Sequence, residues 1–210
     1  MLTLSDNYGL ELHAQHSLRS ADYLQIAQLA SHEAPQSNNS QTIFEQLSTF
    51  TFEQFFGFTC HLFITTDSSE TREQLSLILP SFGSIAVLSL LKIANHFYPC
   101  EEVKALALKS LQHMPNQPLA VGIGRILEGE IAEEMRSAIA HRLVQMPVQR
   151  QEQILRLLAE QLSLTTWEKL EAELSQGQSN GSDVVTFDPH NRRIKIRIKN
   201  NEEQPAEIAC

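Results

Sequence analysis

The sequence predicts a mainly α-helical protein of stacked antiparallel helical hairpins, as a short α-solenoid or a bundle, with a small C-terminal β-hairpin. Three observations support this fold class: helical periodicity through the middle of the chain, an internal repeat within it, and alternating hydrophobicity near the C-terminus. With 42% hydrophobic and 20% charged residues among its 210, the chain has a globular composition. A collagen-like or wholly disordered chain is therefore excluded.

Residues 1–66 are expected to form an N-terminal cap region of mixed helix and short strands. Residues 2–13 alternate apolar and polar side chains around a turn-rich centre, which is typical of a small hairpin, and residues 17–31 have helical spacing. Seven of the ten phenylalanines lie in residues 43–63, where we expect one or two short helices with a break at Gly57. The cluster is interpreted as the core of a cap that covers the first repeat, and an exposed aromatic binding surface is the alternative.

Residues 67–175 are predicted to be a helical repeat body. The capping sequence of residues 67–70 begins a helix that runs to Leu79 and is ended by Pro80. Further helices follow, and the last one presents Trp167 and two leucines on one face. The prolines that separate these helices are Pro80, Pro99, Pro115 and Pro147.

Within this body, residues 101–117 are repeated at residues 133–149. Six of the 17 aligned positions are identical, and both copies begin with paired glutamates, which suit the positive end of a helix macrodipole. Each copy also carries the same apolar stripe, at helical spacing i, i+3, i+4, i+8 and i+11. The stripe consists of Val103, Leu106, Ala107, Leu111 and Met114 in the first copy, and Met135, Ala138, Ile139, Leu143 and Met146 in the second.

Units of helix, proline-containing turn and helix, spaced by about 32 residues, make residues 70–174 resemble HEAT-like helical-hairpin repeats. The resemblance implies antiparallel helix pairs that stack into an extended wall with a binding surface. An ordinary helical bundle with two similar amphipathic helices is the alternative.

Gly122 and Gly124 fall inside one of the predicted helices. Each costs the helix about 1 kcal/mol relative to alanine, which indicates that a neighbouring backbone or bulky side chain comes close there. A phosphate-binding loop is disfavoured because no strand precedes the pair and no third glycine follows.

The C-terminal region is predicted to comprise a linker (176–183), a basic β-hairpin (184–199) and a disordered tail (200–210). In its second strand isoleucines alternate with basic residues. Five of the 16 Lys and Arg residues of the chain fall within residues 192–199. A two-stranded hairpin is marginal alone, so its apolar face must pack on the helical body, on the N-terminal segment of residues 2–12 or on another chain. A sheet closed by the two termini, with the basic residues outside, is the favoured interpretation. Self-association or strand addition to a partner, and contact with nucleic acid, are the alternatives.

The charge and cysteine content constrain the partners and the compartment. A formal charge of −9 opposes binding of nucleic acid or anionic membrane by the whole surface. Three scattered cysteines indicate a reducing compartment, and the N-terminus lacks the pattern of a secretory leader. We therefore expect an acidic, cytoplasmic protein without a membrane span, a cofactor or a metal site.

The leading functional hypothesis is a non-enzymatic, protein-binding scaffold or adaptor, because no constellation of acid, base and nucleophile is found. A protein is the expected partner, a homodimer through the hairpin is a second option, and nucleic acid is disfavoured. The predicted partner-binding residues are Glu101, Glu102, Glu133 and Glu134 on an acidic face, and Arg193, Lys195, Arg197 and Lys199 on the hairpin.

Two alternatives stay open. The HEAT-like resemblance permits an accessory or chaperone-like subunit of an enzyme system, for example in chromophore attachment, with Cys60, His61 and Cys100 as the candidate residues. A regulator that contacts nucleic acid through the C-terminal strand is the other.

Overall fold

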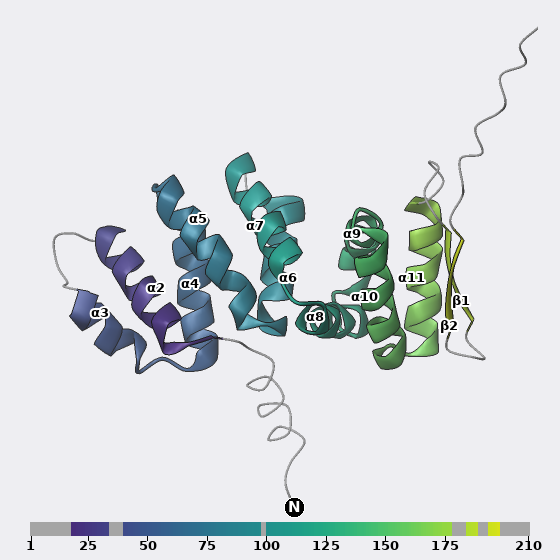
Figure 1. The fold of residues 1–210 in the computed structure, drawn as a ribbon, viewed down its shortest axis with the longest axis horizontal. Coiled ribbons are helices and arrows are strands. Elements are labelled where there is room, and N and C mark those ends of the chain that lie inside the picture. The colour runs from purple at the N-terminus through teal and green to yellow at the C-terminus, as the bar shows by residue number, and fades with distance from the viewer. Residues whose placement is uncertain (1–17, 34–39, 98–99, 178–183, 189–192, 198–210) are drawn as a thin grey trace, which may run out of the picture.

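The computed structural model describes residues 18–33, 40–97, 100–177, 184–188 and 193–197. Ten α-helices in these ranges pack side by side into an elongated array (Figure 1). Helices α2 (Ser20–Glu33) and α3 (Ser40–Leu47) lie at one end, and α11 (Leu164–Gly177) lies at the other. The described part of the chain is therefore mainly helical, as the sequence predicts.

Helix α4 (Phe52–Thr65) begins with a capping box. The Thr51 hydroxyl accepts a hydrogen bond from the Gln54 backbone N–H, and the Gln54 side chain accepts one from the Thr51 N–H. The predicted break at Gly57 is wrong, because α4 runs through this residue and the chain breaks between α3 and α4 instead. A single exposed glycine costs a helix only about 1 kcal/mol, which the buried phenylalanines on either side of it outweigh.

The phenylalanine cluster is mostly core. Phe82, in the 3₁₀ turn η1 (Leu79–Phe82), is 1% exposed and lies at the centre of the cluster. Three rings of α4 surround it with centroid distances of 5.3–5.7 Å, namely Phe52, Phe55 and Phe56. Tyr23 of α2 stacks on the Phe55 ring, which joins the first helix to the same core. The interpretation of this cluster as the core of the N-terminal region is confirmed, and Phe50 is its one exposed ring among the described residues.

Helix α5 (Ser69–Ile78) is capped by Ser68, whose hydroxyl accepts the Thr71 backbone N–H. It gives way to η1 next to Pro80, close to the predicted end. Helix α6 (Ser84–Lys92) continues into a π-helical turn, η2 (Ile93–Phe97). Across the described ranges, no helix has the length and apolar character needed to cross a bilayer.

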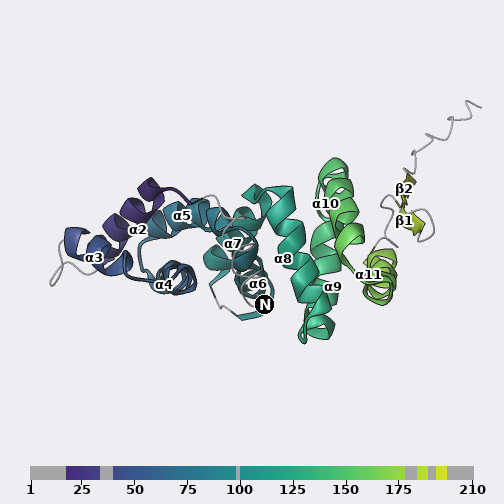
Figure 2. The same ribbon diagram turned by 90° about the horizontal axis from the view of Figure 1, so that it is seen from below.

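Four further helices form the middle of the array: α7 (Glu101–His113), α8 (Asn116–Glu128), α9 (Ala132–Val144) and α10 (Val148–Gln161). Alternate helices pack on each other, with α5 on α7, α6 on α8, α8 on α10 and α9 on α11. In both ribbon views α8 lies between α6 and α7 on one side and α9 and α10 on the other (Figures 1 and 2). This arrangement is compatible with stacked helical hairpins.

The two aligned sequence segments form α7 and α9, and both bury the predicted face. At three equivalent positions of the stripe the side chains are at most 5% exposed in both helices: Val103, Ala107 and Leu111 in α7, and Met135, Ile139 and Leu143 in α9. The expectation that both helices present the same apolar face to the interior is confirmed.

Gly122 of α8 lies where α6 approaches most closely. A Cβ on this glycine would be 2.4 Å from Cγ2 of Val87 and 2.9 Å from the Ser84 carbonyl oxygen. The prediction of a close neighbour is therefore confirmed for Gly122. At Gly124 the nearest atom is the Gln161 side-chain oxygen, at 3.1 Å, which belongs to a flexible side chain.

Strands β1 (Val184–Asp188) and β2 (Arg193–Arg197) pair antiparallel beyond α11. The side chains of residues 176–210 lie outside the described part of the chain, so the predicted basic face of this hairpin stays a prediction. The predicted strands of residues 2–13 and the predicted disordered tail also lie outside the described residues. Helix α11 extends to Gly177, two residues into the predicted linker.

Candidate binding site

Two of the predicted acidic residues, Glu101 and Glu102, lie in the first turn of α7. Glu101 is exposed and its carboxylate is 2.8 Å from Nζ of Lys104 in the same helix. Glu102 is 2.8 Å from Nη1 of Arg72 in α5, a side chain that is only 10% exposed. This ion pair therefore links α7 to α5, and the Glu102 carboxylate is already occupied by a contact within the fold.

Glu133 and Glu134 occupy the equivalent turn of α9. Both oxygens of Glu133 accept hydrogen bonds of 2.9 Å from Arg136, and Lys169 of α11 lies 3.4 Å away. The hydrogen bonds and charge of Arg136, followed by those of Lys169, lower the pKa of Glu133 to about 2. Glu134 is exposed and makes no ion pair with another described residue. The acidic face is thus a row of carboxylates of which three already have cationic partners.

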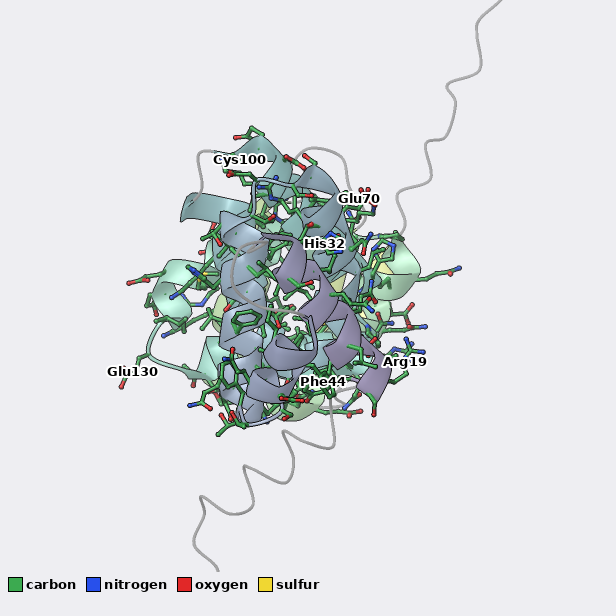
Figure 3. The ribbon with its side chains drawn as sticks, turned by 90° about the vertical axis from the view of Figure 1, so that its left-hand side faces the viewer. Arg19, His32, Phe44, Glu70, Cys100 and Glu130 are labelled. Carbon is green, nitrogen blue, oxygen red and sulfur yellow. The ribbon has the colours of Figure 1, made fainter. Side chains whose placement is uncertain are left out.

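The cysteine and histidine candidates are not brought together into a catalytic arrangement. Cys60 is buried in α4, where desolvation raises the pKa of its thiol to about 11 despite a hydrogen bond with Ser89. Its neighbour His61 is exposed on the same helix, and Cys100 is exposed at the edge of the array (Figure 3). Nor do the described side chains include a cluster of three or more His, Cys, Asp or Glu that could hold a metal ion.

A groove opens between α7 and α9. Its cavity volume is about 640 Å³, within the range of about 300–1,000 Å³ that is usual for ligand sites. Leucines and isoleucines of α6, α7, α8 and α9 form the floor, and polar side chains of α7, α9 and α10 form the rim. The floor includes Leu91, Leu108, Leu119, Ile123 and Ile139.

Arg142 of α9 lies at the rim of this groove and is half-buried. Its guanidinium donates to neutral amides only: Nε and Nη2 to Oδ1 of Asn95, at 3.2 and 2.9 Å, and Nη1 to Oε1 of Gln145, at 3.1 Å. Desolvation by burial lowers its pKa. Within the described residues, Arg142 has no carboxylate partner to offset that cost.

The second arginine of the rim, Arg150 of α10, has a different role. It donates to the backbone carbonyls of Leu111, Gln112 and Met114 at the C-terminal end of α7, and to the Asn116 side chain. A cation is stabilised at this end of a helix by the macrodipole. Arg150 therefore fastens α10 to the end of α7 and fixes one wall of the groove.

The aligned repeat copies differ at a position that lines the groove. Arg142 occupies the position of Ser110 in α7, a residue that is 0% exposed. The Ser110 hydroxyl donates to the Ser76 carbonyl at 2.7 Å, and its small size allows α7 to pack directly on α5. Arg142 at the equivalent position of α9 is half-buried instead and lies at the rim of the groove.

Comparison with known proteins adds no template for this site. No family model, curated protein or solved structure matches the chain.

The groove residues were not among those that the sequence pattern identified. Arg142 carries a signal that the alignment could have shown: a small residue next to the apolar stripe of one repeat copy is replaced by a long cation in the other. Arg150 carries no such signal, because its partners are backbone carbonyls of another helix.

Proposed function

We propose that this chain is a non-enzymatic binding protein, a scaffold or adaptor that holds a partner polypeptide on an array of tandem helical hairpins. The open groove between α7 and α9 is the observation that carries the proposal. Its apolar floor offers surface whose burial drives association, and its rim offers hydrogen-bond donors that orient a partner. The packing of alternate helices supports the repeat architecture that such binding walls use.

The acidic face is proposed as a secondary contact region. Glu101 and Glu134 are exposed at the starts of α7 and α9, where a basic segment of the partner can reach them. Glu134 has the least competition, since a partner would compete with Lys104, Arg72 and Arg136 for the carboxylates of the other three. Exposed charge pairs add little affinity, about 0–1 kcal/mol each, so this face steers association more than it stabilises the complex.

The basic hairpin is proposed as a second attachment point, either for the same partner or for another copy of this chain. The alternation of Arg193, Lys195, Arg197 and Lys199 with isoleucines supports this role. An accessory role that uses a reactive thiol has less support, because the raised pKa of Cys60 leaves almost no thiolate near neutral pH.

The test is affinity capture of the tagged full-length chain from its native cells after mild crosslinking, with quantification by mass spectrometry. We expect one or a few polypeptides in near-stoichiometric amounts. Leu108→Glu, which places a carboxylate in the groove, should deplete them. The double variant Glu101→Lys with Glu134→Lys shows how much the acidic face contributes to recovery of the partner. Truncation after residue 183 shows how much the hairpin contributes. Recovery of no polypeptide above the tag-only control would contradict the proposed function.

A further inference from the structure

The ionisable residues that line the groove between α7 and α9 are all basic. They are His113, Arg142 and Arg150, in a chain whose 25 acidic residues outnumber its 16 Lys and Arg. The local charge is thus opposite in sign to the net charge of −9. Complementarity therefore favours a partner group that is negatively charged.

Arg142 is the group best placed to receive that charge. Its three hydrogen bonds to Asn95 and Gln145 use three of the five guanidinium N–H groups. One N–H on Nη1 and one on Nη2 have no acceptor among the described residues. Two donors on the terminal nitrogens of one guanidinium match the two oxygens of a carboxylate.

The volume of the groove limits what can enter it. Its volume of about 640 Å³ lies within the range usual for ligand sites. Several large apolar side chains from one face of a peptide fit this space, while the peptide backbone stays at the rim.

We propose that the groove between α7 and α9 binds a short segment of a partner protein in which an aspartate or glutamate lies beside two or three large apolar side chains. The carboxylate binds Arg142, and the apolar side chains displace water from the floor formed by Leu108, Ile123 and Ile139. This inference rests on the function proposed above and adds the chemistry of the partner and the place where it binds.

A peptide selection on the full-length chain tests this chemistry without a known partner. Random dodecapeptides displayed on phage are selected on the wild-type chain, and the winners are synthesised for measurement of Kd by fluorescence anisotropy. We expect winners that share an acidic residue flanked by Leu, Ile or Phe. Replacing that acidic residue by its amide should weaken binding about tenfold or more. Failure to enrich peptides, or winners without an acidic residue, would overturn the proposal.

Substitutions in the chain locate the binding. Arg142→Gln should weaken the acidic peptide about tenfold or more and leave its amide analogue unchanged, while Arg142→Lys should restore part of the loss. The matched control is Arg156→Gln, because Arg156 is an exposed arginine of α10 outside the groove, ion-paired with Glu152. Equal losses for Arg142→Gln and Arg156→Gln would mean general charge attraction and would overturn the proposal. Leu108→Glu is the second variant and should abolish binding.

Two further measurements distinguish other occupants of the groove. Decanoate has a carboxylate and an apolar chain but is not a polypeptide. If decanoate displaces the labelled peptide at a lower concentration than the free peptide does, the groove would be assigned to a small amphiphile. A tenfold gain in peptide affinity on truncation after residue 199 would assign it to the chain's own C-terminal segment. Either result would overturn the proposal.

The outcomes also separate this inference from the proposed function. If a captured partner binds the Arg142→Gln protein with the same affinity as the wild-type chain, the scaffold function is supported and the proposal of binding in the groove is refuted. Selected peptides that need Arg142, together with no partner from cells, support the groove chemistry and refute the scaffold function. Peptides and a captured partner that both depend on Arg142 support both proposals.

Discussion

Replacing Gly122 by alanine tests the packing of α6 on α8, which forms part of the floor of the groove. The added Cβ would lie 2.4 Å from Cγ2 of Val87 and 2.9 Å from the Ser84 carbonyl oxygen, whereas carbon atoms in optimal contact are about 3.5–4.0 Å apart. Val87 is 0% exposed, so its methyl group has little room to move. The helices must therefore shift apart to accept the substitution.

The expected magnitude follows from two opposing effects. Alanine gains about 1 kcal/mol over glycine in a helix interior. Overpacking of a close-packed core costs about 1–3 kcal/mol, and the upper end applies here because one of the contacted atoms is backbone. We therefore expect Gly122→Ala to lower the free energy of unfolding by about 2 kcal/mol.

Urea unfolding followed by far-UV circular dichroism provides the assay, with the same substitution at two other glycines as controls. Gly57→Ala should raise the free energy of unfolding by about 0.5–1 kcal/mol, because no atom lies within 4 Å of its added Cβ. Gly124→Ala should change it little, since only the flexible Gln161 side chain must move. In a Val87→Gly background Gly122→Ala should lose only part of its cost, because the contact with the Ser84 carbonyl oxygen remains. A Gly122→Ala protein as stable as the wild type would refute this reasoning.

Three other predictions concern charge, reactivity and the N-terminal core. The pKa of Glu133 is about 2 in the folded chain against an ordinary 4.5, so its stabilising pairing with Arg136 is fully present above pH 4.5 and is lost as the pH falls toward 2. Glu133→Gln should therefore reduce the loss of stability across that window, and an unchanged acid-unfolding profile would contradict the pairing. In a Cys210→Ser protein at neutral pH, iodoacetamide should modify exposed Cys100 and spare buried Cys60 until the chain unfolds, as mass spectrometry can show. Phe82→Ala should lower the free energy of unfolding by about 3–5 kcal/mol in urea titrations, and a loss below 1 kcal/mol would argue against the ring cluster.

The parts of the fold that the sequence predicts well are those set by local periodicity. Val103 and Met135 begin apolar stripes whose spacing alone defines the buried faces of α7 and α9. Gly122 is a second example, because a glycine inside a predicted helix favours a close neighbour there, and that neighbour is Val87 of α6. Gly57 shows the limit of such arguments, since tertiary packing of the phenylalanines overrides the propensity of one residue.

The groove could not be predicted because it depends on contacts between helices distant in sequence. Arg150 is held in position by hydrogen bonds to backbone carbonyls at the end of α7, which lie more than thirty residues earlier in the chain. The sequence predicts Glu102 as a partner-binding residue of an acidic face, yet its carboxylate is bound by Arg72, thirty residues away in the chain. Sequence shows which residues carry charge, and only the fold shows which of those charges are already paired.

Hydrogen–deuterium exchange on the full-length chain, with and without a selected acidic peptide at saturating concentration, locates the bound peptide on the fold. We expect slower exchange at the C-terminal ends of α7 and α9, in residues 108–114 and 139–147, which include the residues of these helices that line the groove. The same peptide should give no such protection in the Arg142→Gln protein. Protection confined to the N-terminal helices α2 to α4, or to the exposed starts of α7 and α9, would contradict binding in the groove.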